Sequence, residues 1–216
     1  TDALNLAISG LLRPNDHVIT TRLEHNAVLR PLYHHAMDHN VVLDHVRFDE
    51  NGFLDPEAFL PLFRPATRMV VVNHASNVLG TIQPVKEIGR MCRERDVIFI
   101  VDASQSAGKI AIDVQEMNID VLVFTGHKSL FGPTGSGGMY VGKNIHIRHT
   151  RAGGTGVQSA DLHHLEDYPF RMEYGTLNVL GIAGLFAGVK WVVEKGIQQI
   201  HAHEMKLVQR LRDGLS

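Results

Sequence analysis

Two ionisable residues each follow a short apolar segment typical of a buried strand. Residues 121–125 (VLVFT) lead into Gly126, His127 and Lys128, and residues 97–101 (VIFIV) lead into Asp102. A glycine-rich run, GPTGSGG, comes soon after Lys128 and leaves its backbone open to close approach. Because ligands of open α/β sheets bind at the carboxyl ends of strands, we expect both side chains at one edge of a sheet.

An amine and a carboxylate placed in this way suit one kind of cofactor chemistry. The Lys128 amine could form a Schiff base with an aldehyde, and the Asp102 carboxylate could keep a pyridine nitrogen protonated so that the ring accepts electrons. These are a protein's contributions to pyridoxal phosphate (PLP) catalysis. A solvated lysine and a turn or helix-cap carboxylate would look the same, so spacing alone leaves both interpretations open.

Five longer segments resemble a known family in their order along the chain. They are HNAVLRPL, NHASNVLG, VDASQSAG, FTGHKSLFGPTGSGG and RMEYGTLNVLGIAGL. The chain resembles the class V aminotransferase family of PLP enzymes over nearly its whole length, and most of all the cysteine desulfurase branch. The resemblance implies an α/β fold of the PLP-transferase large-domain type. We expect a mostly parallel sheet with one antiparallel strand, and helices on both faces.

The resemblance also implies roles around the cofactor ring. Lys128 would bond the aldehyde, Asp102 would pair with the pyridine nitrogen, and His25 would stack on the ring face. Gln105 would hydrogen-bond the phenolic oxygen, and Asn77 would reach both that oxygen and the substrate carboxylate. By residue type alone, His25 could be a helix cap or loop residue, and Asn77 a turn former.

The cofactor phosphate is assigned in the same way. Thr1, Asp2 and Ala3 match the family's phosphate-binding turn, where a helix start offers free N–H groups and partial positive charge. Thr1 could instead only cap its helix. The resemblance brings Thr125 and His127 to the same phosphate.

Thr176 lies in RMEYGTLN and implies an oligomer. Its family counterpart reaches the phosphate of the other subunit, so we expect a homodimer with shared sites. Without the resemblance, this segment would be predicted only as a turn.

Composition narrows the functional classes. The 216 residues suit one or two domains, and 44% hydrophobic with 20% charged residues allows a sizeable core. A net charge of -2 argues against nucleic-acid binding. We expect no membrane association, because no apolar run could cross a bilayer and the start is not signal-like. Because Cys92 is the only cysteine, a reducing cytoplasm is the simplest location.

The ends of the chain suggest a fragment. Family members extend further in both directions, and the chain opens and closes within helical patterns. We expect residues 1–216 to be an incomplete PLP-binding large domain without the N-terminal segment, one of its strands, and the C-terminal small domain. The sulfur-accepting cysteine and the substrate-binding arginine are expected beyond Ser216. Cys92, on one apolar helix face with Val85 and Ile88, is predicted to be a packing residue.

The reaction implied by the resemblance is PLP-dependent cysteine desulfuration. It converts L-cysteine to L-alanine, leaves an enzyme persulfide, and can involve a sulfur-acceptor protein. A selenocysteine lyase, another β-lyase and an aminotransferase remain open, as does a catalytically inactive fragment that dimerises. These residues do not specify the physiological substrate.

The remaining pattern predicts the elements that carry these residues. Strands are expected at 18–20, 41–46, 69–73 and 139–141, the last antiparallel by resemblance, and helices at 28–39, 56–63 and 181–195, with a helix-compatible segment at 113–118. His35 and His39 have metal-ligand spacing, but no further ligand is nearby and no metal site is expected. Dinucleotide, P-loop and serine-hydrolase motifs are lacking; Tyr140, for example, stands where a dinucleotide motif needs glycine.

Overall fold

A single six-stranded sheet forms the centre of the computed structural model, which describes residues 1–215. The strand order is β2-β1-β3-β4-β5-β6; the first five strands are parallel, and β6 is antiparallel to β5. The strands are β1 (His17–Thr21), β2 (Val42–Val46), β3 (Thr67–Asn73), β4 (Ile98–Asp102), β5 (Val121–Thr125) and β6 (Gly137–Val141). The predicted mostly parallel sheet with one antiparallel strand is confirmed.

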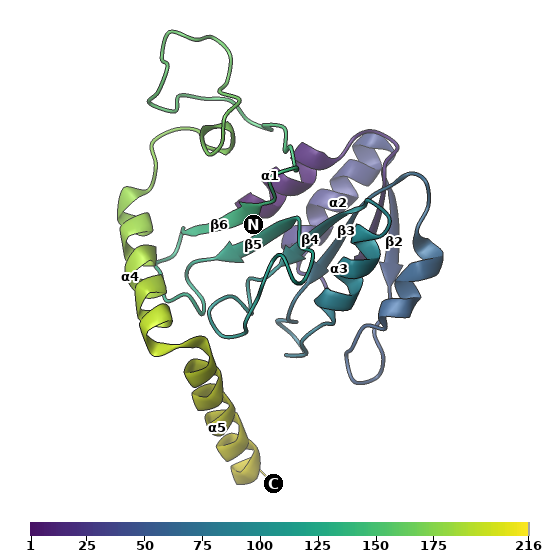
Figure 1. The fold of residues 1–216 in the computed structure, drawn as a ribbon, viewed down its shortest axis with the longest axis vertical. Coiled ribbons are helices and arrows are strands. Elements are labelled where there is room, and N and C mark those ends of the chain that lie inside the picture. The colour runs from purple at the N-terminus through teal and green to yellow at the C-terminus, as the bar shows by residue number, and fades with distance from the viewer. Residues whose placement is uncertain (216) are drawn as a thin grey trace.

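Helices cover both faces of this sheet, as predicted (Figure 1). The helices α1 (Asp2–Leu11) and α2 (Asn26–His39) pack on one face, and α3 (Val85–Arg93) with the 3-10 helix η1 (Pro56–Leu62) on the other. A hydrophobic core lies on each face of the sheet, and alternate residues of β3 belong to different cores. Met69 and Val71 face α1 and α2, whereas Val70 and Val72 face α3. This period of two is what a strand buried on both faces requires.

Two segments with helical patterns do not form α-helices. In the helix-compatible segment 113–118, residues 114–118 form turns, and the Asp113 carboxylate accepts hydrogen bonds from the backbone N–H groups of Gln115 and Glu116. A segment this short cannot offset the cost of helix nucleation. The helix predicted at 56–63 is a 3-10 helix over Pro56–Leu62, with Pro61 inside it.

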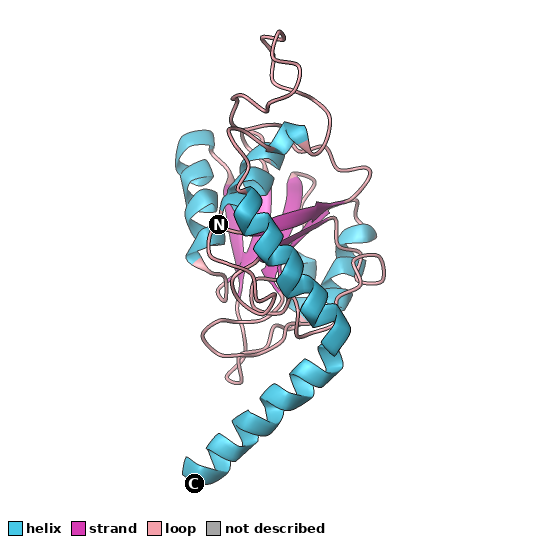
Figure 2. Ribbon diagram, turned by 90° about the vertical axis from the view of Figure 1, so that its left-hand side faces the viewer, coloured by secondary structure: helices cyan, strands magenta, loops and turns pink. Residues whose placement is uncertain are grey.

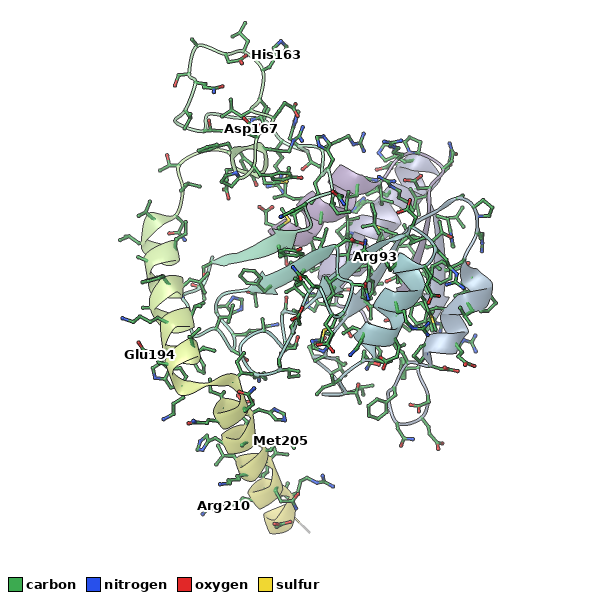
Figure 3. The ribbon with its side chains drawn as sticks, viewed as in Figure 1. Arg93, His163, Asp167, Glu194, Met205 and Arg210 are labelled. Atoms are coloured by element: carbon green, nitrogen blue, oxygen red, sulfur yellow. The ribbon has the colours of Figure 1, made fainter. Side chains whose placement is uncertain are left out.

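The C-terminal part extends from the sheet as two consecutive helices. They are α4 (Val179–Lys195) and α5 (Ile197–Leu215), preceded by the short 3-10 helix η2 (Phe170–Met172), and α5 projects well beyond the body (Figures 1 and 2). Figure 3 places Glu194 on α4, and Met205 and Arg210 on α5, away from the sheet. None of the helices in residues 1–215 is long and apolar enough to cross a membrane.

The strand order fixes where a ligand would bind. The chain leaves β1 toward β2 on one side, and then returns past β1 to begin β3 on the other side. The sheet therefore has a topological switch point between β1 and β3, and ligands of such sheets bind outside the carboxyl ends of the strands there.

Candidate functional site

Four neighbouring strands deliver most of the predicted site residues to one edge of the sheet. The strands β1, β3, β4 and β5 are adjacent and parallel, so their carboxyl ends form a common rim. Asp102 pairs across the sheet with Asn73 on β3 and Val123 on β5. The strand ends and loops of this rim carry His25, Asn77, Asp102, Gln105, Thr125, His127 and Lys128.

Asp102 is the buried carboxylate of the rim. It ends β4 with a residual exposure of 5%, and its Oδ1 accepts a hydrogen bond from the Ser104 N–H at 2.9 Å. No side chain within residues 1–215 pairs with it. A buried carboxylate with one backbone donor retains the capacity to bind a cationic group.

His74 braces the loop that follows Asp102, a role that the sequence did not indicate. Its backbone N–H donates to the Asp102 carbonyl, and its Nδ1 lies 2.9 Å from Ser106 Oγ. Burial lowers the pKa of His74, so the ring is neutral near pH 7. His74 and Ser106 therefore fix the backbone around Asp102 without adding charge.

Lys128 is exposed at the adjacent strand end. Its amine makes no ion pair or hydrogen bond within the described part of the chain, and its carbonyl accepts from the Phe131 N–H at 3.0 Å. Three residues before Lys128, the Thr125 Oγ1 lies 2.9 Å from Nδ1 of His127. The free amine and this hydroxyl–imidazole pair thus share one short turn.

Helix α4 supports the loop that contains Lys128. A Cβ on Gly188 would lie 2.2 Å from the Leu130 carbonyl oxygen, so helix and loop backbones are in direct contact. Phe131 has a positive φ of 55° and its ring meets Trp191 edge-on, with centroids 4.9 Å apart. Backbone packing and an aromatic contact therefore hold the lysine loop.

His25 occupies the N-cap of α2, and Nδ1 of its ring accepts from the Ala27 N–H at 3.0 Å. The capping role considered for His25 is thus observed, whereas stacking stays a prediction. Because Nδ1 accepts, a neutral ring carries its proton on Nε2. His25 also shares with Thr1 a cavity of about 430 Å³ between α1 and α2, lined further by Asn5 and Ser9.

The phosphate-binding turn predicted at Thr1, Asp2 and Ala3 begins α1. Thr1 is the N-cap residue but makes no side-chain capping bond, so its hydroxyl is uncommitted. Asp2 instead binds Arg151 at 2.5 Å and the Tyr174 hydroxyl at 3.1 Å, and Ala3 packs against the core. Asp2 thereby ties the start of α1 to the loop that precedes Thr176.

Three other predicted residues lie on loops. Asn77 and Thr176 are exposed and Gln105 is half-buried, and their side chains make no hydrogen bond within residues 1–215. Their proposed contacts with a cofactor or a second subunit stay predictions.

Cys92 packs on α3 as predicted. It is fully buried, and burial raises the pKa of its thiol, so it is unsuited to nucleophilic chemistry. The rings of His35 and His39 are tilted by 38° with centroids 5.3 Å apart, and His35 Nε2 lies 2.9 Å from Ser9 Oγ. Residues 1–215 hold no group of three or more His, Cys, Asp or Glu side chains arranged to bind a metal.

The chemistry of the rim residues fits PLP. The buried Asp102 carboxylate suits a protonated ring nitrogen, and the unpaired Lys128 amine suits an aldehyde. The uncommitted Thr1 hydroxyl and the N-terminal amides of α1 suit a phosphate.

Fold and rim together define a ligand-binding α/β domain of the open-sheet class. The chain belongs to the aminotransferase class-V family, whose sequence profile matches residues 1–216.

Within this family, the chain is similar to proteins described as cysteine desulfurases. The chain is 36% identical to a probable cysteine desulfurase of Pyrococcus abyssi and 34% identical to the cysteine desulfurase IscS of Pseudoalteromonas translucida, in each case over all of this chain. These alignments cover 55% and 51% of the relatives, so the chain spans about half their length. The structure resembles an apo cysteine desulfurase from Thermococcus onnurineus, with a TM-score of 0.91 and 34% identity over 99% of this chain and 55% of that one.

Proposed function

We propose that this chain is the PLP-binding large domain of a cysteine desulfurase. The observation that carries the proposal is the position of two groups at adjacent strand ends: the unpartnered Lys128 after β5 and the buried Asp102 carboxylate at the end of β4. Similarity to cysteine desulfurases along the whole chain supports the same reading.

PLP, when bound, supplies an electron sink that stabilises negative charge on a substrate carbon. In this proposal the Asp102 carboxylate would hold a proton on the ring nitrogen, and Lys128 Nζ would anchor the cofactor and move the substrate Cα proton. His25 would orient the ring. Asn77 and Gln105 would bind the phenolic oxygen.

The phosphate would be held by Thr125, His127, Thr1 and the N-terminal amides of α1. Their donors suit an anion, and the helix start adds partial positive charge. Thr176 would reach the phosphate of a second subunit, which makes the proposed enzyme a homodimer.

The proposed reaction removes sulfur from L-cysteine to give L-alanine, with a thiolate accepting the sulfur as a persulfide. Because Cys92 is buried in the α3 core, it is not the thiolate of this proposal. An acceptor protein could then receive the sulfur. Assays that compare L-cysteine, selenocysteine and amino-donor substrates separate desulfuration from selenocysteine lyase and aminotransferase activity.

Absorbance tests the cofactor proposal directly. Titration with PLP should give a visible band that Lys128→Ala abolishes and that Lys143→Ala retains. Lys143 is a matched control because it is also an exposed lysine just after a strand, β6. Since β6 is antiparallel to β5, and Val141 at its end pairs with the first residue of β5, Lys143 lies at the edge of the sheet opposite the rim. A band that survives in Lys128→Ala contradicts the assignment.

A second candidate function is a dimerising scaffold without catalysis. Exposed apolar side chains along α4 and α5 favour it, among them Leu180 at 87%, Phe186 at 70% and Leu211 at 63% exposure. A dimeric protein that stays colourless with PLP would support this alternative.

A further inference from the structure

Glu24 is a buried acid in the turn between β1 and α2, directly before His25. Its side chain retains 7% exposure, although carboxylates are almost never buried unless they are paired. No lysine or arginine within residues 1–215 forms an ion pair with it. Its burial therefore needs another explanation.

Hydrogen bonds join Glu24 to both sides of the switch point. Its Oε1 accepts from Thr21 Oγ1 on β1 at 2.7 Å, and from the backbone N–H of Asn73 on β3 at 3.0 Å. The Asn73 side-chain amide donates in turn to the Leu23 carbonyl. These three hydrogen bonds, which we call the clasp, join the turn before His25 to the end of β3, next to Asp102.

Two buried oxygens of this clasp have no hydrogen-bond partner. They are Glu24 Oε2 and Asn73 Oδ1, and both are acceptors when Glu24 is ionised. A protonated carboxyl carries an O–H donor instead, so protonation removes a buried charge and adds a donor to a site with an excess of acceptors.

The electrostatic surroundings of Glu24 also favour its protonated form. Burial raises the pKa of Glu24 to about 8, against the opposing hydrogen bonds from Thr21 and Asn73, and the charge of Asp102 adds to the rise. Three other ionisable residues lie next to the Glu24 and Asn73 segments. Arg22 and His25 are exposed, and Arg22 forms no ion pair with Glu24; His74, which follows Asn73, is buried and neutral.

We propose that Glu24 is a positioning residue that remains protonated at neutral pH and, as a neutral acid, locks the His25 turn to β3 next to Asp102. This arrangement keeps a second buried negative charge away from the carboxylate proposed to face the ring nitrogen. The part of the inference that concerns PLP rests on the proposed function, whereas the protonation of Glu24 does not.

The first test measures stability against pH without PLP. Between pH 4.5 and 8 the folded protein holds a proton on Glu24 that the unfolded chain has released, so stability falls as pH rises. The contribution approaches a tenfold change in the unfolding constant for each pH unit. Glu24→Gln, which stays neutral, should lose this slope. Glu57→Gln, at an exposed position of η1, should keep it.

Infrared spectroscopy gives an independent readout. Wild-type protein at pH 7 should show a carboxylic-acid C=O band that is missing from Glu24→Gln and retained in Glu57→Gln. An unchanged pH slope in Glu24→Gln, or the lack of this band, overturns the assignment of the proton.

The second test addresses positioning. Glu24→Ala should bind PLP at least about tenfold more weakly, since two hydrogen bonds of the clasp are lost, and Glu24→Gln should restore the affinity. Wild-type affinity in Glu24→Ala overturns the positioning role. If wild-type protein itself fails to bind PLP, the proposed function fails, while the stability and infrared results still decide whether Glu24 is protonated.

Discussion

Gly108 touches the backbone of Ser129: a Cβ on Gly108 would lie only 2.2 Å from the Ser129 carbonyl oxygen. Gly108 belongs to the loop that follows Asp102, and Ser129 directly follows Lys128. The two loops that carry the proposed catalytic groups are therefore packed against each other without an intervening side chain. Gly108 also has a φ of +92°, which disfavours any other residue.

Replacing Gly108 should destabilise the protein and loosen the rim. In Gly108→Ala, the left-handed backbone costs about 1–2 kcal/mol and the clash with Ser129 adds about 1–3 kcal/mol. Gly80→Ala is the matched control, because Gly80 has a φ of +76° but open space around it. Urea unfolding measures both variants, and PLP affinity should fall only in Gly108→Ala. Equal costs in the two variants would refute the proposed contact.

Helix α4 offers a second test of how the lysine loop is held. Alanine normally stabilises a helix relative to glycine by up to about 1 kcal/mol, so Gly214→Ala in α5, with open space around it, should be neutral or stabilising. Gly188→Ala should instead destabilise by about 1–3 kcal/mol, because its Cβ meets the Leu130 carbonyl. Thermal unfolding distinguishes the signs, and a stabilised Gly188→Ala would show that the loop moves freely.

The sequence predicted which residues lie at the rim better than it predicted the contacts that hold the rim loops in place. Lys128 and Asp102 could be located because each follows an apolar strand, and parallel strands end at a common edge. The contact of Gly108 with Ser129 could not be predicted, because it depends on how two loops fold in space. The roles proposed for His25 and Thr176 come from the family resemblance, because spacing alone does not indicate them.

The role of Glu24 could not be predicted from the sequence. Thr21 and Glu24 are three residues apart, a spacing also found in capping boxes, where the threonine is the helix N-cap. Helix α2 begins at Asn26 instead, and Glu24 turns inward to β3. Burial in the assembled core, rather than local propensity, determines its chemistry.

The charge of Asp102 should matter more than its shape. Asp102→Asn keeps an oxygen for the Ser104 N–H but loses the charge for the ring nitrogen, so PLP affinity should fall about 10- to 100-fold. Asp113→Asn is the control, since Asp113 accepts from the Gln115 N–H at 2.9 Å in an equivalent turn but is exposed. Equilibrium titration with PLP measures both, and equal affinities would exclude a charged contact.

Mixed subunits test the shared site implied by Thr176. A Lys128→Ala subunit paired with a Thr176→Val subunit leaves one site with an intact lysine and an intact threonine from the opposite subunit. Mixing the two variants should therefore restore wild-type PLP affinity at half of the sites in the heterodimers. Without restoration, Thr176 does not act across the interface.

Mild acid should destabilise the fold through buried histidines, and His17 is the clearest case. It lies at the start of β1, 1% exposed, with Nδ1 2.8 Å from Thr67 Oγ1 and Nε2 3.2 Å from Asp44. Burial, reinforced by Arg64, lowers the pKa of His17 below 6.5 despite Asp44.

The sign of the effect follows from linkage. As pH falls below 6.5, the unfolded chain gains a proton on His17 before the folded protein does, so the free energy of unfolding decreases, by at most about 1.4 kcal/mol per pH unit. Measured in a Glu24→Gln background, which removes the opposite slope, His17→Gln should flatten this loss. His34→Gln, at an exposed position of α2, should leave it unchanged. Stability that rises on acidification in that background would contradict the lowered pKa of His17.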